Sequence, residues 1–322
     1  MAEILTLDYV SADNNKVITG LGYIKEYSFV PRKNMQNKFY VSGMLQKKEK
    51  LLSFKVFEDA VVQAFKNTNL VGQVLNLNVT VNEYRGQMSL IINSFANNEG
   101  IEYDMVDFIR THDVQSNYNE FTKYLTDNLS QDELAIVNGV FSIPEDGFTR
   151  FALEYAGKAY HDACAGGVLY HTLKMLRLFD FVCGNDYRIE TMCEKLPKFK
   201  QLCRVAIILH DFGKVVEMRD GVYTASSIVS HRVRGVEYLA RNREAVIKVY
   251  GEDGYDYLIT CLVGHHGEFE GETPTTVYAY MVHVIDMLDT CVTHTLEGVL
   301  ADANVDSDGR RFVRVNDMHL YY

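Results

Sequence analysis

The hydrophobic period of this chain changes once along its length, and that change constrains the fold more than any other feature. Between Val17 and Phe95, apolar and polar residues alternate as they do in half-buried strands. From Asn117 onward, apolar residues recur every three or four positions, which is the period of an amphipathic helix. The chain is therefore expected to fold as a multidomain α+β protein, with a β domain followed by a helical one.

The β part contains five predicted strands and one predicted helix. The strands cover residues 17–27, 38–45, 51–57, 74–81 and 87–95, and the helix covers residues 59–66, between the third and fourth strands. A five-stranded barrel with a helix at this point is typical of the OB fold. The order favours an OB-type β-barrel over residues 1–96, and another small barrel or half of a β-sandwich stays an alternative.

The helical part shows eight segments of helical period, joined to the β part by a connector over residues 97–116. They cover residues 118–129, 131–141, 148–160, 168–183, 199–209, 230–250, 255–263 and 277–296. Asn117 and Ser130 are suitable caps for the first two. We expect an all-α domain over residues 117–322.

Charge is divided unevenly between the two parts. The whole chain has 32 Lys and Arg against 43 Asp and Glu, a net charge of −11. Residues 1–95 hold 11 basic and 8 acidic residues, or +3, so the remaining residues carry −14. This excludes a protein coated with basic charge for nucleic-acid binding, but it leaves a local basic surface in the β part.

Apolar runs are far shorter than the ~20 residues that span a bilayer, and the N-terminus shows no secretion signal. The six cysteines form no Cys-x-x-Cys pair, so a zinc ribbon is not supported. We therefore expect a cytoplasmic protein with reduced thiols and no membrane partner.

Histidine and aspartate recur on or beside the predicted helices in a pattern that suits metal binding. The pair His210-Asp211 ends the apolar run Val205–Leu209, and other members lie far away in sequence: His171, His231, His265, His266 and Asp286. Imidazole nitrogens and carboxylate oxygens together bind transition ions, and one carboxylate can bridge two of them. The series predicts a two-metal site in a helical core, although capped or hydrogen-bonded core histidines are the alternative.

These motifs resemble those of the HD-domain metal-dependent phosphohydrolases. The matching strings include Gly166-Gly167-Val168-Leu169-Tyr170-His171-Thr172, His210-Asp211-Phe212-Gly213-Lys214, His265-His266-Gly267 and His283-Val284-Ile285-Asp286-Met287-Leu288-Asp289. Over roughly residues 15–295 the chain resembles the YhaM-type 3′→5′ exoribonucleases, in which an OB fold precedes the HD domain. Asp162 departs from the pattern because the family usually has a second histidine there, and we expect Asp162→His to be tolerated.

The resemblance implies a metal-dependent 3′→5′ exonuclease that hydrolyses phosphodiester bonds of single-stranded RNA and also of single-stranded DNA. Asp211 would bridge two divalent ions, with the remaining ligands divided between them: His171, His210 and Asp286 for one ion, and His231, His265 and His266 for the other. Lys214 would offset charge on the phosphate, unless it is an ordinary surface lysine. The imidazole-rich set favours Mn²⁺, with Mg²⁺, Fe²⁺, Ni²⁺ and Co²⁺ as alternatives.

The β part is expected to bind the strand, because its basic residues are interleaved with aromatic ones. The candidates are Lys38, Phe39, Lys47, Tyr84 and Arg85. Aromatic faces stack on unpaired bases while cations follow the phosphates, but the same aromatics could fill the barrel. Two other functions stay open: a phosphohydrolase of small nucleotides whose barrel serves oligomerisation, and a non-catalytic single-strand-binding protein. A homo-oligomer is compatible with any of the three.

Overall fold

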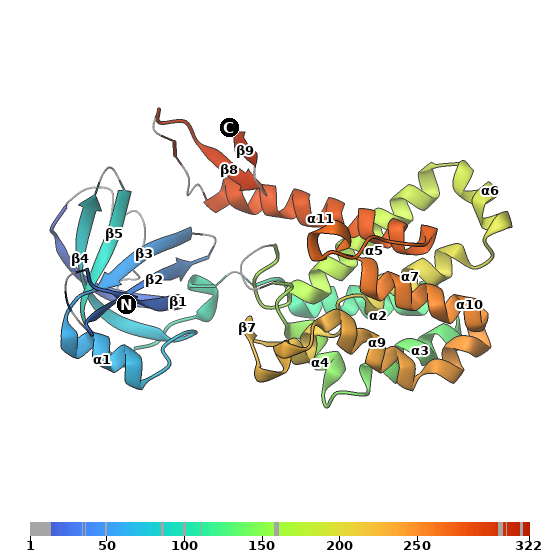
Figure 1. The fold of residues 1–322 in the computed structure, drawn as a ribbon, viewed down its shortest axis with the longest axis horizontal. Coiled ribbons are helices and arrows are strands. Elements are labelled where there is room, and N and C mark those ends of the chain that lie inside the picture. Colours follow the sequence, from blue (N-terminus) through green and yellow to red (C-terminus); the bar gives the residue numbers. More distant parts are fainter. Residues whose placement is uncertain are drawn as a thin grey trace. The chain divides into compact units, whose positions relative to one another are not determined.

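The structure is a computed structural model that describes residues 14–33, 35, 37–48, 50–84, 87–98, 101–109, 111–157, 161–301, 305–306, 308–315 and 318–322 (Figure 1). The chain divides into two compact units, one formed by Met1–Arg110 and Glu297–Tyr322 and the other by Thr111–Leu296. Each is described by itself. The domain boundaries expected from the sequence, 1–96, 97–116 and 117–322, stay predictions.

The first unit contains a closed five-stranded barrel, as predicted. Its strands are β1 (Val17–Pro31), β2 (Phe39–Lys47), β3 (Lys50–Val56), β4 (Val74–Tyr84) and β5 (Gln87–Ala96), in the order β1-β2-β3-β5-β4. β1 pairs with both β2 and β4, which closes the barrel, and β3 pairs with β5 in parallel. Helix α1 (Asp59–Asn67) lies between β3 and β4 in sequence, which is the placement of the OB fold.

Alternation along the strands builds the barrel core. In β4, the alternate residues Leu75, Leu77, Val79 and Val81 are all buried. Phe65 of α1 enters the same core, where Tyr27 donates a hydrogen bond from its hydroxyl to the Phe65 carbonyl oxygen over 3.2 Å. Helix α1 is therefore fixed to the barrel by both apolar packing and a polar contact.

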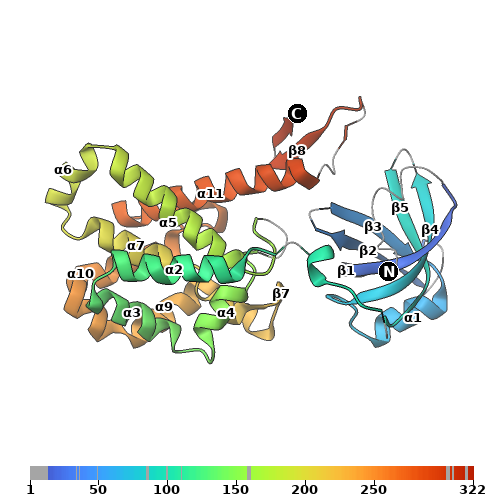
Figure 2. The ribbon, with the colours of Figure 1, turned by 180° about the vertical axis from the view of Figure 1, so that it is seen from behind.

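The second unit is built from helices that surround one large apolar core (Figure 2). The helices of the C-terminal region are α2 (Val114–Asn128), α3 (Gln131–Phe141), α4 (Gly147–Leu153), α5 (Gly167–Asn185), α6 (Arg188–Lys195), α7 (Phe199–Leu209), α8 (Lys214–Glu217), α9 (His231–Arg241), α10 (Arg243–Gly264) and α11 (Val277–Ala301), with short 3₁₀ turns at Met105–Asp107, Ala225–Ile228 and Gly267–Glu270. Helix α7 is central, because the five residues Val205–Leu209 are each at most 1% exposed.

Most predicted helices are confirmed, and the differences have local causes. Helix α2 begins earlier than expected because the Asp113 side chain, not Asn117, accepts a hydrogen bond from the helix start, at the Ser116 amide. Ser130 caps α3 as predicted, in a reciprocal capping box with Glu133. Helix α4 ends at Leu153 instead of continuing to residue 160, and the pattern at 230–250 is divided at Asn242.

Two short hairpins were not predicted in the region expected to be wholly helical. Strands β6 (Met218–Arg219) and β7 (Val222–Tyr223) form one, and β8 (Phe312–Val315) and β9 (Met318–Tyr321) form the other. Strands of two to four residues are too short to show a period in the sequence. Within the ranges described above, no helix has both the length and the apolar composition needed to cross a membrane.

Candidate metal centre

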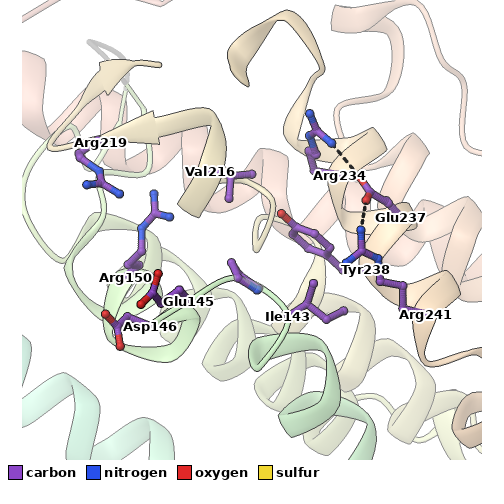
Figure 3. Close-up of a pocket in the computed structure, with 11 residues that line it drawn as sticks. Ile143, Glu145, Asp146, Arg150, Val216, Arg219, Arg234, Glu237, Tyr238 and Arg241 are labelled. Atoms are coloured by element: carbon purple, nitrogen blue, oxygen red, sulfur yellow. Dashed lines mark hydrogen bonds and ion pairs between the residues drawn. The ribbon is translucent and has the colours of Figure 1, made fainter. Parts of the chain in front are cut away.

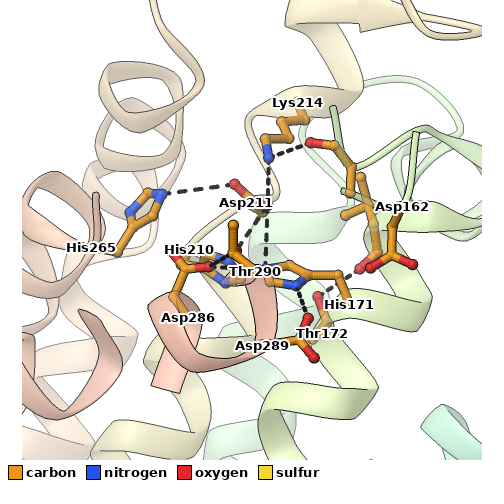
Figure 4. Close-up of polar contacts among 12 residues, drawn as sticks. Asp162, His171, Thr172, His210, Asp211, Lys214, His265, Asp286, Asp289 and Thr290 are labelled. Carbon is orange, nitrogen blue, oxygen red and sulfur yellow. Dashed lines mark hydrogen bonds and ion pairs between the residues drawn. The ribbon is translucent and has the colours of Figure 1, made fainter. Parts of the chain in front are cut away.

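Asp211 lies at the centre of a buried cluster of histidines, and its two carboxylate oxygens face different members of it (Figure 4). Oδ2 is 3.4 Å from Nε2 of His210 and 4.0 Å from Nε2 of His171. Oδ1 is 3.4 Å from Nε2 of His231 and 3.8 Å from Nε2 of His265. One carboxylate thus stands between two pairs of imidazoles, as a bridging ligand would.

The cluster is assembled by four helix segments. His171 is on α5, His210 and Asp211 follow α7, His231 begins α9, and His265 follows α10. The first residue of α5 must be glycine because of close packing: a Cβ at Gly167 would lie 2.0 Å from the carbonyl oxygen of Asp162. Gly166, which precedes the helix, has a φ of +79°, a conformation that favours glycine. These two requirements explain the Gly-Gly pair at the start of the helix that carries His171.

All four histidines present the same ring nitrogen to the cluster. Nδ1 donates to the Ile207 carbonyl oxygen in His210, at 2.7 Å, and to the Leu262 carbonyl oxygen in His265, at 2.9 Å. Nδ1 of His171 and of His231 contacts the carboxylates of Asp289 and Glu217, at 2.7 and 3.0 Å. Because a carbonyl or carboxylate oxygen accepts, each Nδ1 carries a hydrogen, and Nε2 is the ring nitrogen that faces Asp211 and would bind a metal ion in its deprotonated form.

The remaining candidates lie around this core. Oδ1 of Asp286 is 3.2 Å from Nε2 of His171, and the ring of His266 lies 5.1 Å from that of His231. Lys214 is buried and not an ordinary surface lysine: its ammonium donates to Oδ2 of Asp211 over 2.7 Å and to the Ala156 carbonyl oxygen. All seven metal-ligand candidates from the sequence therefore lie in one cluster, with Lys214 beside it.

The electrostatics of the cluster favour a bound cation. Burial alone would raise the pKa of Asp211, but the charges of Lys214 and His210 hold it well below its usual range. Burial likewise opposes the ionised form of Asp286, and its contact with His171 reverses the effect and lowers its pKa. Burial lowers the pKa of His171, but its charge contact with Asp286 and its hydrogen bond to Asp289 raise it to about 10. Both aspartates are thus ionised, and a proton on His171 partly balances them.

Three buried atoms in the cluster lack a hydrogen-bond partner in the described part of the chain: Nε2 of His171, Nε2 of His210 and Oδ1 of Asp211. Buried polar atoms are normally satisfied, so such a group calls for a bound ion or water. Sets of histidine and aspartate atoms here lie within 4.8 Å of one another, including Asp211, His231, His265 and His266, and His210, His265 and Asp286. The residues present fit divalent metal ions.

Sequence reasoning missed two carboxylates that orient the ring nitrogens. Asp289 lies one helical turn after Asp286 on α11, so the two side chains share one face of the helix. This spacing could have indicated from the sequence that Asp289 belongs to the site. Glu217 ends the short helix α8, and no sequence pattern connects it with His231. Its role follows only from the packing of α8 beside α9.

Asp162 also has a role that the sequence did not indicate. It is fully buried, with Oδ2 2.8 Å from the ammonium of Lys174 and Oδ1 3.0 Å from Nε2 of His112. Lys174 in turn lies 2.9 Å from Asp289. The expectation that Asp162→His is tolerated took no account of this network, in which the buried Asp162 is paired with the half-buried Lys174.

The nucleic-acid candidates of the barrel are only partly described. Phe39 is half-buried at the start of β2 with the Lys66 ammonium 4.5 Å from its ring centre, and Lys38 is exposed and 2.7 Å from Asp59. Lys47 ends β2, on the same strand as Phe39. Arg85 and the Tyr84 side chain lie outside the described residues. The binding role of these five residues stays a prediction.

Comparisons with known proteins agree with this architecture. Residues 168–291 match the HD domain family. Over 289 residues the chain is 22% identical to the 3′-5′ exoribonuclease YhaM of Listeria monocytogenes serotype 4b (strain CLIP80459), an alignment covering 85% of this chain and 88% of that protein. Proteins of the same description from Shouchella clausii (23% identity, 75% and 76% coverage) and Halalkalibacterium halodurans (22%, 77% and 79%) are also similar. The chain thus carries an HD domain behind a five-stranded barrel, and it has YhaM 3′-5′ exoribonucleases among its distant homologues.

Proposed function

We propose that this protein is a metal-dependent 3′→5′ exonuclease of single-stranded RNA that also accepts single-stranded DNA. The observation that carries the proposal is the convergence of four histidine Nε2 atoms on both oxygens of Asp211, inside an HD domain. The distant homologues described as 3′-5′ exoribonucleases indicate which phosphodiester such a centre would act on.

The ligand set divides naturally around Asp211. We assign His171, His210, Asp286 and Oδ2 of Asp211 to one ion, and His231, His265, His266 and Oδ1 of Asp211 to a second. Five imidazoles favour Mn²⁺ or a similar transition ion such as Fe²⁺, Co²⁺ or Ni²⁺ over Mg²⁺, which prefers oxygen ligands. Bound there, such ions would lower the pKa of a water molecule and stabilise negative charge on a phosphate.

The protein's own groups hold this arrangement in place. Asp289 and Glu217 fix the ring orientation and the tautomer of His171 and His231. Burial would lower the pKa of Lys214, but Asp211 raises it, so its ammonium stays charged beside the bridging carboxylate. We assign Lys214 a catalytic role with Asp211: its positive charge offsets charge that develops on the substrate phosphate.

The barrel would capture the strand, because it belongs to the part of the chain with net positive charge, and the helical part at −14 repels a polyanion. Phe39 offers a ring for base stacking, and Lys38 and Lys47 offer charge to phosphates. We retain Tyr84 and Arg85 as candidates on their sequence pattern alone.

The test is hydrolysis of one oligonucleotide labelled at its 3′ end or at its 5′ end, with Mn²⁺, beside a panel of free nucleotides. A 3′→5′ exonuclease releases labelled mononucleotide at once from the 3′-labelled strand and shortens the 5′-labelled strand stepwise. Asp211→Asn should abolish hydrolysis, whereas the exposed Asp127→Asn should not. Hydrolysis of free nucleotides alone would instead support the small-nucleotide phosphohydrolase, and binding without hydrolysis would support a non-catalytic protein.

We also propose that the protein pairs with a second copy through α11. Between Val277 and Leu296, every exposed side chain of this helix is apolar, at a spacing of three to four residues: Val277, Tyr280, Val284, Leu288, Val292 and Leu296. The charged residues of this stretch, Asp286 and Asp289, point inward to the metal centre. An uncharged stripe fits another copy of itself across a two-fold axis, where two acidic chains bring no like charges together.

A further inference from the structure

A second polar cavity lies on the helical unit, apart from the metal centre (Figure 3). Its volume is about 630 Å³, within the range of small-molecule sites. Four arginines line it, Arg150, Arg219, Arg234 and Arg241, against three acidic residues, Glu145, Asp146 and Glu237. The region that contains the cavity has a net charge of −14. The cavity lining itself has one more arginine than acidic residues, so its local charge is positive.

The arginines stand on two opposing walls. On one wall, Arg234 and Arg241 of α9 both bind the carboxylate of Glu237, so that two cations share one anion (Figure 3). On the other wall are Arg150 of α4 and Arg219 of β6; Arg150 donates to the Met218 carbonyl oxygen over 3.4 Å. Neither Arg150 nor Arg219 has an ion-pair partner in the described ranges. Arg234 and Arg241 therefore leave one positive charge beyond Glu237, and Arg150 and Arg219 on the other wall offer guanidinium donors beside Glu145 and Asp146.

One buried donor in this cavity is also unsatisfied. Nε of Arg234 is buried and has no hydrogen-bond partner among the described residues. Since buried donors are normally paired, the cavity calls for an acceptor on this wall. Arginine presents its donors in a planar fork that matches phosphate oxygens.

The rest of the lining suits a ring. Ile143, Pro144 and Val216 supply apolar surface, and Tyr238 supplies an aromatic ring between the two walls. Burial raises the pKa of Tyr238, although Arg234 and Arg241 oppose the effect, so its hydroxyl is a neutral donor. Tyr238 also packs edge-on against Phe212, at 6.0 Å between ring centres, and Phe212 follows Asp211. The cavity is thus separated from the metal centre by one aromatic side chain.

From these walls, we propose that the cavity binds a small phosphorylated ligand of nucleotide size, with phosphate oxygens held by the arginines and the base on the apolar lining. The site is distinct from the metal centre and does not depend on its proposed activity. Free phosphates such as pyrophosphate carry the same phosphate oxygens. They would bind to the arginines alone and would make no contact with the apolar lining.

The test is calorimetric titration of the full chain with ADP, pyrophosphate and adenosine. ADP should bind, and Arg219→Ala should weaken it about tenfold, the loss of one charge-assisted contact. Arg219 is exposed and unpaired among the described residues, so its removal should not affect folding. Arg188→Ala is the matched control and should bind ADP normally, because Arg188 is exposed and, among the described residues, pairs with the nearby Asp186.

A second variant tests the opposite direction. Glu237→Gln removes the anion that competes with the ligand, so it should strengthen ADP binding several-fold. Equal affinities of ADP and pyrophosphate would identify phosphate as the whole of the recognised group; weaker binding of pyrophosphate would show that the lining holds the base. The proposal is overturned if neither probe binds, if Arg219→Ala and Glu237→Gln leave the affinity unchanged, or if ADP binding is lost only in Asp211→Asn.

Discussion

Nδ1 of His171 lies 2.7 Å from Oδ2 of Asp289, a residue 118 positions later in the chain. The same oxygen is 2.9 Å from the ammonium of Lys174. Helix α11 therefore sets the ring orientation of a histidine on α5, and the half-buried Lys174 holds the carboxylate that does so. The metal centre depends on this second layer of residues as much as on the ligands themselves.

Asp289→Asn should weaken metal binding about 10- to 100-fold, the usual cost of losing a carboxylate behind a ligating histidine. The amide keeps the size of the side chain but not the charge that fixes the Nδ1 hydrogen of His171. Calorimetric titration with Mn²⁺ measures the affinity, and the exposed Asp127→Asn is the matched control. An unchanged affinity would show that Asp289 has no part in orienting His171.

Gly213→Ala should displace α8 from α9 and reduce both stability and hydrolysis. A Cβ at position 213 would lie 2.0 Å from the carbonyl oxygen of His231, and backbone cannot yield as a flexible side chain would. Gly184→Ala is the control, because nothing lies within 4 Å of its Cβ and alanine in a helix gains about 0.5–1 kcal/mol. Thermal unfolding and the rate of hydrolysis measure the two effects. Equal behaviour of the two variants would contradict the packing argument.

Asp162→His should destabilise the fold, by less than the about 3–5 kcal/mol of breaking an isolated buried ion pair, because it removes one of the two carboxylates beside the half-buried Lys174 ammonium and Asp289 remains. Urea unfolding, followed by circular dichroism, measures the loss. The control is Asp180→His, which removes a carboxylate from a half-buried pair with Arg204 and should cost less. If Asp162→His is as stable as the wild type, the result would instead support the expectation from the sequence that this substitution is tolerated.

The stability contributed by Asp162 should also depend on pH. Burial opposes its ionised form, but hydrogen bonds from His112 and His161 and the charge of Lys174 lower its pKa well below the ordinary value of 3.8. A lowered folded-state pKa stabilises the fold above the unfolded-state value, and the contribution is lost as the pH falls below it. The stability difference between wild type and Asp162→Asn should be constant above about pH 4 and shrink in more acidic buffer. A difference that is the same at pH 3 and pH 7 would contradict this assignment.

Phe39→Ala should weaken binding of a twenty-base oligonucleotide by about 1–3 kcal/mol, which is the binding free energy contributed by one base stacked on an aromatic ring. Hydrolysis of a dinucleotide, which needs only the metal centre, should be unchanged. Phe181→Ala removes a ring that is 66% exposed on α5 and serves as the control. Fluorescence anisotropy at several salt concentrations measures the affinity and its electrostatic part. Equal losses on both substrates would mean that the barrel shapes the active site.

Val292→Glu should convert a dimer into a monomer, because it places a charge in the middle of the α11 stripe. Light scattering after size-exclusion chromatography measures the mass. Ile228→Glu is the control, since Ile228 is 90% exposed and lies in the 3₁₀ turn Ala225–Ile228, away from the stripe. A wild-type chain that is monomeric at every concentration would rule out pairing through α11.

Local patterns in the sequence predicted the two periods of the fold and the residue types of the metal site. Alternation in β4 predicted a strand, and the apolar run before His210 predicted a buried helix, because both signals arise between residues close in the chain. The exact start of α2 could not be predicted in this way, because a single capping contact of Asp113 decides it.

Which side chains contact one another depends on tertiary packing. Asp289 behind His171, Glu217 behind His231, and Arg219 opposite Arg234 come from elements far apart in sequence. Their proximity depends on how α5, α8, α9 and α11 pack, and packing is fixed by the fit of whole buried surfaces. The residue type at each position is known from the sequence, but the atom that its side chain contacts depends on the helix packed against it.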